Sequence, residues 1–472
     1  MRIEMDSIGT LEVPENAYYG VQTLRAKENF NITGHRLHPL FIKNMAKIKK
    51  AAAITNFRAG DLSENKMKAI CQACDEILNG QWMDEFIVDP VQGGAGTSAN
   101  MNANEVIANR GNEILGGGLG IYDRVHPNDD VNRSQSTNDV IPTSGKLTVL
   151  DLIPMLTTEL GRLEAALEDK AIEFAHILKM GRTQMQDAVP MTLGQSFHAY
   201  ASVVKRDIER IHRVSEELCQ VNMGGTAIGS AINVSDLYLN HIVENLAELT
   251  GYPLQQYTDL FDGTQNLDGF VQVSGALKTC AVNLSKMCND LRLLSSGPRT
   301  GFSEINLPAK QNGSSIMPGK VNPVIPEVVT QVAFHVIGHD MTITMAAEAG
   351  QLELNAFEPV LFYNLFESLD MLRGAVSTLV DNCICGITAN EKHCRELVQS
   401  SVGVATALCP YIGYKKSAEI AKEALKTGKS VETLVVGKGL MGKGELEEVL
   451  DPEVMTGLNK YSHIVHNTGR SC

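Results

Sequence analysis

The chain has 472 residues, of which 43% are hydrophobic and 20% are charged, a balance typical of a folded globular protein rather than a disordered one. Its net charge of −14, from 41 basic and 55 acidic residues, argues against a nucleic-acid partner, because no basic excess is available to release the counterions of a polyanion. At roughly 150 residues per domain, this length favours about three domains.

The beginning of the sequence and its cysteines bear on localisation. The first residues, MRIEMDSIGT, lack the charged and apolar regions of a signal peptide, and no apolar run is long enough to span a bilayer. Ten cysteines in so long a chain are typical of reduced, mostly buried thiols rather than of a secreted disulfide framework. We therefore expect a cytoplasmic protein.

Turn signals divide the first third of the chain. They include Pro14, Gly93-Gly94, the triple glycine 116–118 and the segment HPND at 126–129. Helical patterns lie between them, for example over residues 64–78. We expect a mainly helical N-terminal domain over residues 1–138.

Long helical patterns follow over residues 139–387. Apolar residues from Val149 to Leu178 recur at spacings of mostly three, four and seven, which predicts one apolar helical stripe. The segments with the same pattern are 190–221, 265–294, 323–350 and 357–380. Helices of about 25 to 30 residues far exceed the usual length of 11 to 12, and several in succession predict a helix bundle. The remaining residues, 388–472, have a shorter period and predict a small helical C-terminal domain.

Three motifs match binding signatures only in part. The segment GKGLMG at 437–442 contains G-x-G-x-x-G but has no βαβ unit with an acidic residue about 20 positions on, so we do not expect a nucleotide site. The CxxC at 71–74 lies in a helical pattern without a second CxxC, which favours core thiols. His335 and His339 share a helix face but lack the glutamate of H-E-x-x-H and a third ligand. We expect no metal and no required cofactor, and the sequence does not indicate whether a divalent cation activates the protein.

The most informative segment is GSSIMPGKVNP at residues 313–323. Gly313 and Gly319 permit backbone conformations closed to other residues, and two serines, a lysine and an asparagine supply hydroxyl, ammonium and amide groups. Pro323 suits the first turn of the long helix that follows, and a helix N-terminus favours anions. A plain surface loop is the alternative, and we favour a functional loop over it.

Three further polar clusters stand beside helical patterns, at 96–100 (GTSAN), 134–139 (SQSTND) and 181–187 (GRTQMQD). Each alone is better explained as turn and N-cap chemistry. Together with the loop at 313–323, they make a dicarboxylate site plausible, because an acidic protein needs many neutral donors to hold a small dianion.

The segment 313–323 closely resembles the signature loop of the aspartase/fumarase superfamily. Further matches run from residues 6–9 (DSIG) and 18–23 (YYGVQT) to the C-terminal region, so that the resemblance covers essentially the whole chain. The family also has a second dicarboxylate-binding segment, described for fumarases, which HPND at 126–129 matches. We interpret that segment as a turn, since clusters of Asn, Asp and Pro are common turn chemistry.

Within the superfamily, the sequence is similar to aspartases rather than fumarases. The segments that carry this likeness are 304–308 (EINLP), 322–329 (NPVIPEVV) and 351–355 (QLELN). Gln184 stands where fumarases usually carry histidine, and where some aspartases carry glutamine and a few carry histidine.

The resemblance implies the elimination of ammonia from L-aspartate to give fumarate, through an aci-carboxylate intermediate. Ser314 would be the base, acting as an alkoxide, and we expect stacked backbone N–H groups, the following helix N-terminus and Lys320 to stabilise it. Alternatively, Ser314 only hydrogen-bonds the substrate. By the resemblance, the β-carboxylate is held by Thr97, Ser136, Thr137 and Ser315, the α-carboxylate by Thr183, Lys320 and Asn322, and the amino group faces Asn138 and Gln184.

The resemblance further implies an all-α, three-domain fold with a central bundle of five long helices. Four copies would form a homotetramer with a twenty-helix core, and each active site would draw on three subunits. The nearest alternative function is that of a class II fumarate hydratase, with water as the leaving group. A catalytically silent structural or binding member of the same scaffold is a second alternative. Argininosuccinate and adenylosuccinate lyases are less favoured alternatives, because they resemble the chain mainly in the signature loop.

Overall fold

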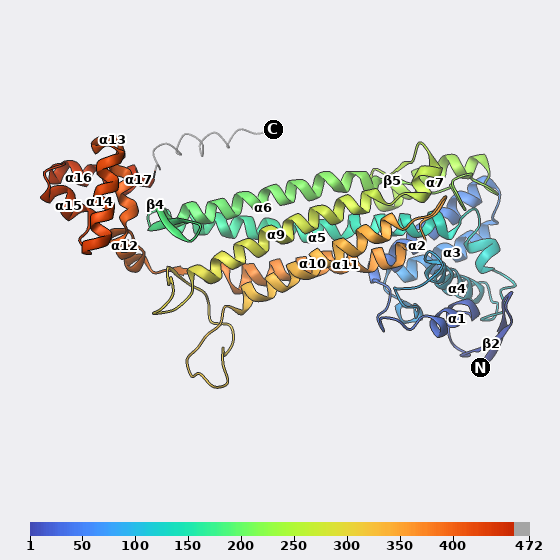
Figure 1. The fold of residues 1–472 in the computed structure, drawn as a ribbon. Helices are drawn as coiled ribbons and strands as arrows, with labels where there is room; N and C mark the ends of the chain where they lie inside the picture. The colour runs from blue at the N-terminus through green and yellow to red at the C-terminus, as the bar shows by residue number, and fades with distance from the viewer. Residues whose placement is uncertain (457–472) are drawn as a thin grey trace. The chain divides into compact units, whose positions relative to one another are not determined.

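The computed structural model describes residues 1–456, which form helices joined by loops and short strands (Figure 1). The chain divides into two compact units. The first comprises residues 1–158, 207–282 and 332–373, and the second comprises residues 159–206, 283–331 and 374 onward. None of the described helices is both long and apolar enough to cross a membrane. The predicted boundaries at 138 and 387 stay a prediction.

The first unit begins with the hairpin β1 (Arg2–Met5) and β2 (Thr10–Val13). Its shorter helices are α1 (Val21–Asn29), α2 (Pro39–Ala59), α3 (Glu64–Leu78), α4 (Thr97–Ile114), α7 (Asp236–Thr250) and α8 (Leu260–Gln265). Helix α2 starts with Pro39 in its first turn and ends at Gly60, which has a φ of 84°. These are the proline start and glycine stop expected from the conformations of the two residues.

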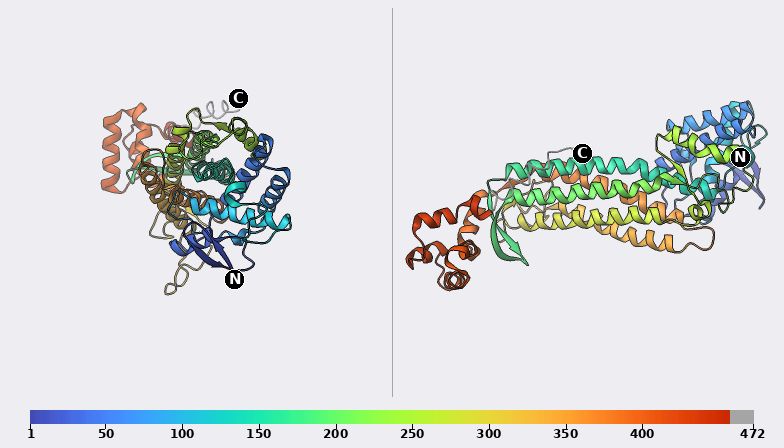
Figure 2. Two further views of the ribbon diagram at one scale, coloured as in Figure 1. Left: turned by 90° about the vertical axis from the view of Figure 1, so that its right-hand side faces the viewer. Right: turned by 90° about the horizontal axis from the view of Figure 1, so that it is seen from above.

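Five long helices contribute a segment to each unit (Figure 2). They are α5 (Thr137–Glu173), α6 (Leu193–Ser215), α9 (Asp268–Leu294), α10 (Val324–Glu348) and α11 (Glu358–Asn382). In the first unit, Lys278 of α9 donates to Asp340 of α10 at 2.6 Å. In the second unit, Tyr200 of α6 donates to Asp290 of α9 at 2.9 Å. The prediction of a helical, multi-domain fold with successive long helices is confirmed.

An aromatic cluster holds α5 against α11 in the first unit. Phe362 of α11 stacks on Phe366, with ring centroids 5.6 Å apart, and lies edge-on to Phe270 of α9 at 5.1 Å. A Cβ atom on Gly145 of α5 would lie 2.3 Å from the Phe362 ring. Glycine at this position therefore lets the two helices approach closely, and a larger residue would displace a buried ring.

The connection between α5 and α6 differs from the prediction. The structure has a β-hairpin here, with β3 (Leu178–Thr183) antiparallel to β4 (Gln186–Thr192), where we expected a loop and then a helix from residue 190. The apolar stripe from Val149 consequently ends with α5 at Glu173, and Leu178 belongs to β3. The pattern misled because apolar residues at the end of α5 and in β3 continue one apparent spacing. Helix α10 starts at Val324, one residue after Pro323.

The second unit contains β7 (Ile305–Asn306) and β8 (Thr388–Ala389), which pair, and a group of short helices toward the C-terminus. These helices are α12 (Glu391–Ser400), η5 (Val402–Leu408), α13 (Cys409–Ile412), α14 (Tyr414–Thr427), α15 (Val431–Gly437), α16 (Lys443–Val449) and α17 (Pro452–Thr456). Their buried core includes Leu408, Ile420 and Val435, together with Met180 of β3. The hairpin β3–β4 thus packs on the C-terminal helices.

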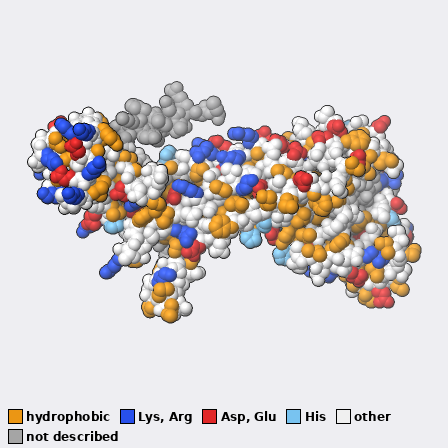
Figure 3. All heavy atoms as spheres, in the orientation of Figure 1, with side chains coloured by type: hydrophobic (Ala, Val, Ile, Leu, Met, Phe, Trp, Pro, Cys, Tyr) orange, Lys and Arg blue, Asp and Glu red, His pale blue; other side chains and the backbone are white. Residues whose placement is uncertain are grey.

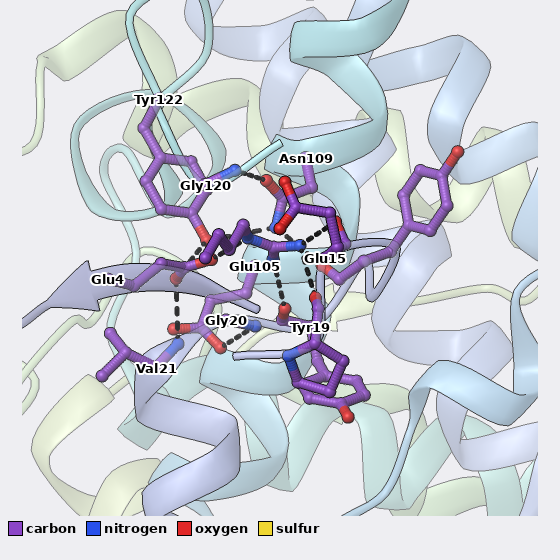
Figure 4. Close-up of polar contacts among 12 residues, drawn as sticks. Glu4, Glu15, Tyr19, Gly20, Val21, Glu105, Asn109, Gly120 and Tyr122 are labelled. Carbon is purple, nitrogen blue, oxygen red and sulfur yellow. Dashed lines mark hydrogen bonds and ion pairs between the residues drawn. The ribbon is translucent and has the colours of Figure 1, made fainter. Parts of the chain in front are cut away.

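Glu105 of α4 anchors the segment YYGVQT that carried part of the family resemblance. Its buried carboxylate accepts hydrogen bonds from the backbone amides of Gly20 (2.8 Å), Gln22 (3.0 Å) and Thr23 (3.1 Å), and from the Thr23 hydroxyl (2.6 Å). Figure 4 shows Gly20 beside Glu105, with Glu4 reaching Val21 from β1. The segment is therefore tied to the same helix that begins at Thr97.

Candidate active site

The signature loop leaves β7 and reaches α10 without regular secondary structure. Its neck is closed by the Gly313 amide, which donates to the Lys320 carbonyl at 3.1 Å, and by the Asn322 side-chain amide, which donates to the Gly313 carbonyl at 2.6 Å. A Cβ atom on Gly313 would lie 2.3 Å from that Lys320 carbonyl oxygen. Gly319 has a φ of 80°, a left-handed conformation. Both glycines are therefore needed for the shape of the loop.

Ser314 lies directly beyond this neck. Its hydroxyl oxygen accepts hydrogen bonds from the backbone amides of Ile316 (3.2 Å) and Met317 (3.0 Å). Converging backbone N–H groups stabilise negative charge on an oxygen. Among the described residues no hydrogen bond or ion pair joins Ser314 to Lys320. Of the groups expected to stabilise the Ser314 alkoxide, the two backbone amides are the ones that contact its oxygen in this chain.

Thr183 and Gln184 stand at the exposed tip of the hairpin β3–β4. Thr183 pairs with Gln186, and the two residues of the turn, Gln184 and Met185, have φ values of 52° and 63°. Two-residue turns of this kind usually contain Asn-Gly, because most side chains strain the left-handed conformation. Backbone strain of this sort concentrates at functional sites, so the unusual turn supports a role for the tip.

Thr97 opens α4 in the first unit, after three consecutive residues with positive φ, Gly94, Ala95 and Gly96. Its hydroxyl donates to the Gly94 carbonyl at 2.7 Å. In the same helix, the Asn100 side chain donates to the Thr137 hydroxyl at 3.3 Å. Asn100 thus joins the start of α4 to the start of α5.

Ser136, Thr137 and Asn138 surround the start of α5. The Ser136 hydroxyl accepts from the Asn138 amide at 3.3 Å, as an N-capping side chain does. The Asn138 side chain donates to the Ala227 carbonyl at 2.7 Å. In this chain, therefore, Asn138 is oriented by the loop that precedes α7.

The ten predicted residues form two groups. The first unit holds Thr97, Ser136, Thr137 and Asn138, and the second holds Thr183, Gln184, Ser314, Ser315, Lys320 and Asn322. Hydrogen bonds through Asn100 connect the starts of α4 and α5 in the first group. In the second group, the signature loop and the hairpin tip are two separate segments, and no hydrogen bond links them among residues 1–456.

The sequence prediction missed Asp139. This buried carboxylate accepts hydrogen bonds from the backbone amides of Ser136 (2.9 Å), Gly224 (3.1 Å) and Thr226 (3.2 Å). Burial raises the pKa of Asp139 to about 6, against the opposing effects of these amides and of the Lys49 charge. Asp139 lies within the polar segment 134–139, and that segment was the only indication of its role in the sequence. Composition alone does not distinguish a side chain that caps a helix from one that binds a substrate.

Lys49 of α2 was also missed. Its buried ammonium group donates to the side-chain oxygens of Asn100 at 2.7 Å and Asn132 at 2.9 Å. Burial lowers the pKa of Lys49 to about 7, and the nearby Asp139 carboxylate opposes this change. A lysine inside a helix of ordinary pattern gives no sequence signal. The structure places a buried cation beneath Asn100, which contacts Thr137.

The segment 126–129 forms the start of a short helical turn, Pro127–Val131. The His126 side chain caps it and accepts from the backbone amides of Asn128 and Asp129. This geometry agrees with the interpretation of the segment as a turn. Within residues 1–456, no group of three or more His, Cys, Asp or Glu side chains is arranged to hold a metal ion.

Two family models match most of the chain. Residues 9–338 match the model of the lyase family, and residues 404–457 match that of the fumarase C C-terminus. The chain belongs to the fumarase/aspartase superfamily of lyases. The resemblance inferred from the signature loop is thereby confirmed.

Relatives of this lyase cover almost its full length. Aspartate ammonia-lyase from Helicobacter pylori (strain ATCC 700392 / 26695) is 53% identical over 96% of this chain and 98% of its own. The proteins of the same name from a Bacillus species and from Escherichia coli (strain K12) are 51% and 50% identical, over 97% and 95% of this chain and equal shares of their own.

Solved structures agree with the fold of the lyase. A fumarate lyase:delta crystallin from Brucella melitensis, bound to cobalt, superposes with a TM-score of 0.94 at 50% identity, covering 96% of this chain and 99% of its own. A class II fumarase from Schistosoma mansoni superposes with a TM-score of 0.93 at 35% identity, with the same coverage.

Proposed function

We propose that this lyase eliminates ammonia from L-aspartate to give fumarate, as a carbon–nitrogen lyase. The relatives named aspartate ammonia-lyase are 50% to 53% identical over at least 95% of the chain. The class II fumarase from Schistosoma mansoni is 35% identical. Gln184 stands where fumarases usually carry histidine, which agrees with the higher identity to the aspartate ammonia-lyases. A fumarate hydratase is therefore not favoured.

The observation that carries the mechanism is the pair of backbone amides that donate to the Ser314 oxygen. A serine is normally too weak an acid to ionise near neutral pH, and donors aimed at the oxygen lower the free energy of its alkoxide. Ser314 removes the proton from the carbon next to the β-carboxylate, and the electron pair of that C–H bond moves into the carboxylate. When the aci-carboxylate collapses, the carboxylate is restored and the electron pair forms the new carbon–carbon double bond of fumarate. The C–N bond breaks in the same step, and its electron pair leaves with the amine as ammonia or, after protonation, ammonium.

The remaining predicted residues hold the two carboxylates and the amine. Thr97, Ser136, Thr137 and Ser315 donate to the β-carboxylate, where charge develops, and Thr183, Lys320 and Asn322 hold the α-carboxylate. Asn138 and Gln184 face the amino group. The hydroxyl groups of Ser136 and Thr137 stand at the start of α5, where the helix dipole favours an anion.

A homotetramer in which each active site draws on three subunits is part of this proposal, because the family resemblance implies it. Helix α10 supports association, because it exposes Phe334, Ile337, Met341 and Met345 at spacings of three and four. Such a stripe on one helix is costly in water and is covered when copies pack together. Figure 3 shows exposed hydrophobic side chains between charged ones on the face that it draws.

Catalysis in this mechanism needs no cofactor, because the donors and the base belong to the chain. Dialysis against a chelator followed by an assay with and without added Mg²⁺ tests this proposal and any activation by a divalent cation. A cytoplasmic location is also proposed. It agrees with free thiols at the nine cysteines of the described residues, since disulfides are rare in that compartment.

The function is tested by mixing the purified protein with L-aspartate, and in parallel with L-malate, and following fumarate by its ultraviolet absorbance. Fumarate from L-aspartate alone supports the proposal. Fumarate from L-malate alone would establish a fumarate hydratase. No product from either, by a folded tetramer, would leave a structural or binding role on the lyase scaffold.

A further inference from the structure

Glu304 is a buried carboxylate that binds two cations of the strand β3. It has an exposed fraction of 0%. Arg182 donates to its Oε1 atom at 2.8 Å, and the Lys179 ammonium nitrogen lies 3.6 Å from its Oε2 atom. The Arg182 guanidinium also stacks on the ring of Phe302, 4.4 Å from its centroid. Removal of this carboxylate would leave two largely buried positive charges without their counter-ion, which is costly.

The backbone holds Glu304 itself in place. Its amide donates to the Leu294 carbonyl at 2.8 Å, and its carbonyl accepts from the Asn390 amide at 2.9 Å. Ser303, immediately before it, has a φ of 48°, a left-handed conformation. The backbone of Glu304 is therefore fixed between the end of α9 and the strand pair β7–β8, on the N-terminal side of the signature loop.

Arg182 immediately precedes Thr183 and Gln184 at the tip of the hairpin β3–β4. The turn at Gln184 and Met185 is strained, and an isolated two-stranded hairpin is marginally stable by itself. Contacts outside the hairpin must therefore hold the tip. On β3 these contacts include the ion pair of Arg182 with Glu304, and on β4 they include Asp187, which accepts from the Ser401 hydroxyl at 2.7 Å.

We propose that Glu304 is a positioning residue, whose ion pair with Arg182 orients the hairpin tip so that Thr183 and Gln184 meet the α-carboxylate and amino group of the substrate. The role rests on the proposed function, since it concerns the recognition of L-aspartate. Glu304 does not touch the substrate. It acts through β3, and its negative charge is required because it neutralises Arg182 and Lys179 together.

The test measures kcat and KM for L-aspartate in Glu304→Gln, which keeps the shape of the side chain and removes its charge. We expect KM to rise by about tenfold or more with a smaller change in kcat, because contacts with the ground-state substrate are lost. Glu304→Asp, which keeps the charge, should recover part of the affinity. Arg182→Lys keeps a cation but loses the guanidinium group, which contacts both Glu304 and the Phe302 ring, and it should also raise KM.

A double-mutant cycle separates this role from a general structural one. In a Thr183→Ala, Gln184→Ala background, the tip makes no substrate contacts to be oriented, so Glu304→Gln should change KM by less than about twofold. A matched control is Glu76→Gln, which breaks the 2.6 Å ion pair between Arg110 and Glu76 in the first unit and should leave KM unchanged.

Equal rises of KM in both backgrounds, or an unaltered KM in a folded Glu304→Gln tetramer, would overturn the inference while the proposed function stands. If Glu304→Gln does not fold, Arg182→Lys decides by the same cycle. A wild-type protein that does not act on L-aspartate overturns the proposed function, and with it this role for Glu304.

Discussion

The carboxylate of Asp139 accepts a hydrogen bond from the backbone amide of Ser136 at 2.9 Å. Its other oxygen accepts from the amides of Gly224 and Thr226, in the loop before α7. One buried side chain therefore fixes both the start of α5, with its predicted substrate-binding residues, and the loop to which Asn138 donates.

This arrangement predicts a loss of activity on acidification that is separate from unfolding. Burial raises the pKa of Asp139 from 3.8 to about 6, so the carboxylate takes up a proton as the pH falls through about 6. A protonated carboxyl is a poorer acceptor for three amides, and the cradle at the start of α5 loosens. Because the folded-state pKa is raised, the contribution of this group to stability is largest at low pH and is lost as the pH rises through about 6.

The measurement is kcat/KM for L-aspartate between about pH 5 and 8, with circular dichroism at each pH as a check on folding. We expect the activity to fall toward pH 5 in a protein that stays folded. Asp139→Asn should be less active at neutral pH and should lose part of this acid limb. An identical acid limb in Asp139→Asn would show that another group controls it.

Ser314→Ala should abolish most turnover but keep the binding affinity for the substrate analogue succinate. The loss of a base costs roughly a factor of 10² to 10⁴ in kcat. Affinity should persist because the carboxylate donors remain, and it is measured as the inhibition constant or by calorimetry. Ser400→Ala, at an exposed serine of the same unit, is the matched control and should behave as wild type. A Ser314→Ala enzyme with most of its turnover would eliminate Ser314 as the base.

Gly313→Ala should damage the signature loop and leave the rest of the fold intact. The added Cβ atom would lie 2.3 Å from the Lys320 carbonyl and 2.8 Å from the Asn322 amide, and both are backbone atoms that do not move aside freely. We expect kcat/KM to fall by more than about tenfold with a nearly unchanged melting temperature, because the loop lies at the surface. Gly444→Ala, in α16 with open space around it, is the control. Full activity in Gly313→Ala would mean that the neck of the loop tolerates rearrangement.

Much of the fold could be predicted from the sequence, because long amphipathic helices have a strong period. Helix α3 was predicted at its observed bounds, and α9 and α11 within a few residues. The hairpin β3–β4 was not, because its turn, Gln184-Met185, lacks the Asn-Gly signal of a tight hairpin.

The candidate site could be predicted only through its segments. Polar clusters and the glycine of the loop neck were visible, since Gly313 lies among serines and an asparagine. The contacts that organise the clusters were not, because Asp139, Lys49 and Glu304 act across long sequence separations. Glu304, for example, meets Arg182 from 122 residues away. Neither periodicity nor local composition indicates contacts between residues so far apart in the sequence.

Glu105→Gln should destabilise the fold without a direct effect on chemistry. The carboxylate accepts four hydrogen bonds at its two oxygens, from Gly20, Gln22 and Thr23, and a glutamine amide would face those donors with an N–H group of its own. The free energy of unfolding should fall by about 2 to 4 kcal/mol, because buried donors are left without an acceptor. Chemical denaturation of the tetramer at fixed protein concentration measures this difference. Glu12→Gln, at an exposed position of β2, is the control and should change stability by less than about 0.5 kcal/mol. Equal stabilities of the two variants would mean that the segment from Gly20 to Thr23 is held by its packing rather than by Glu105.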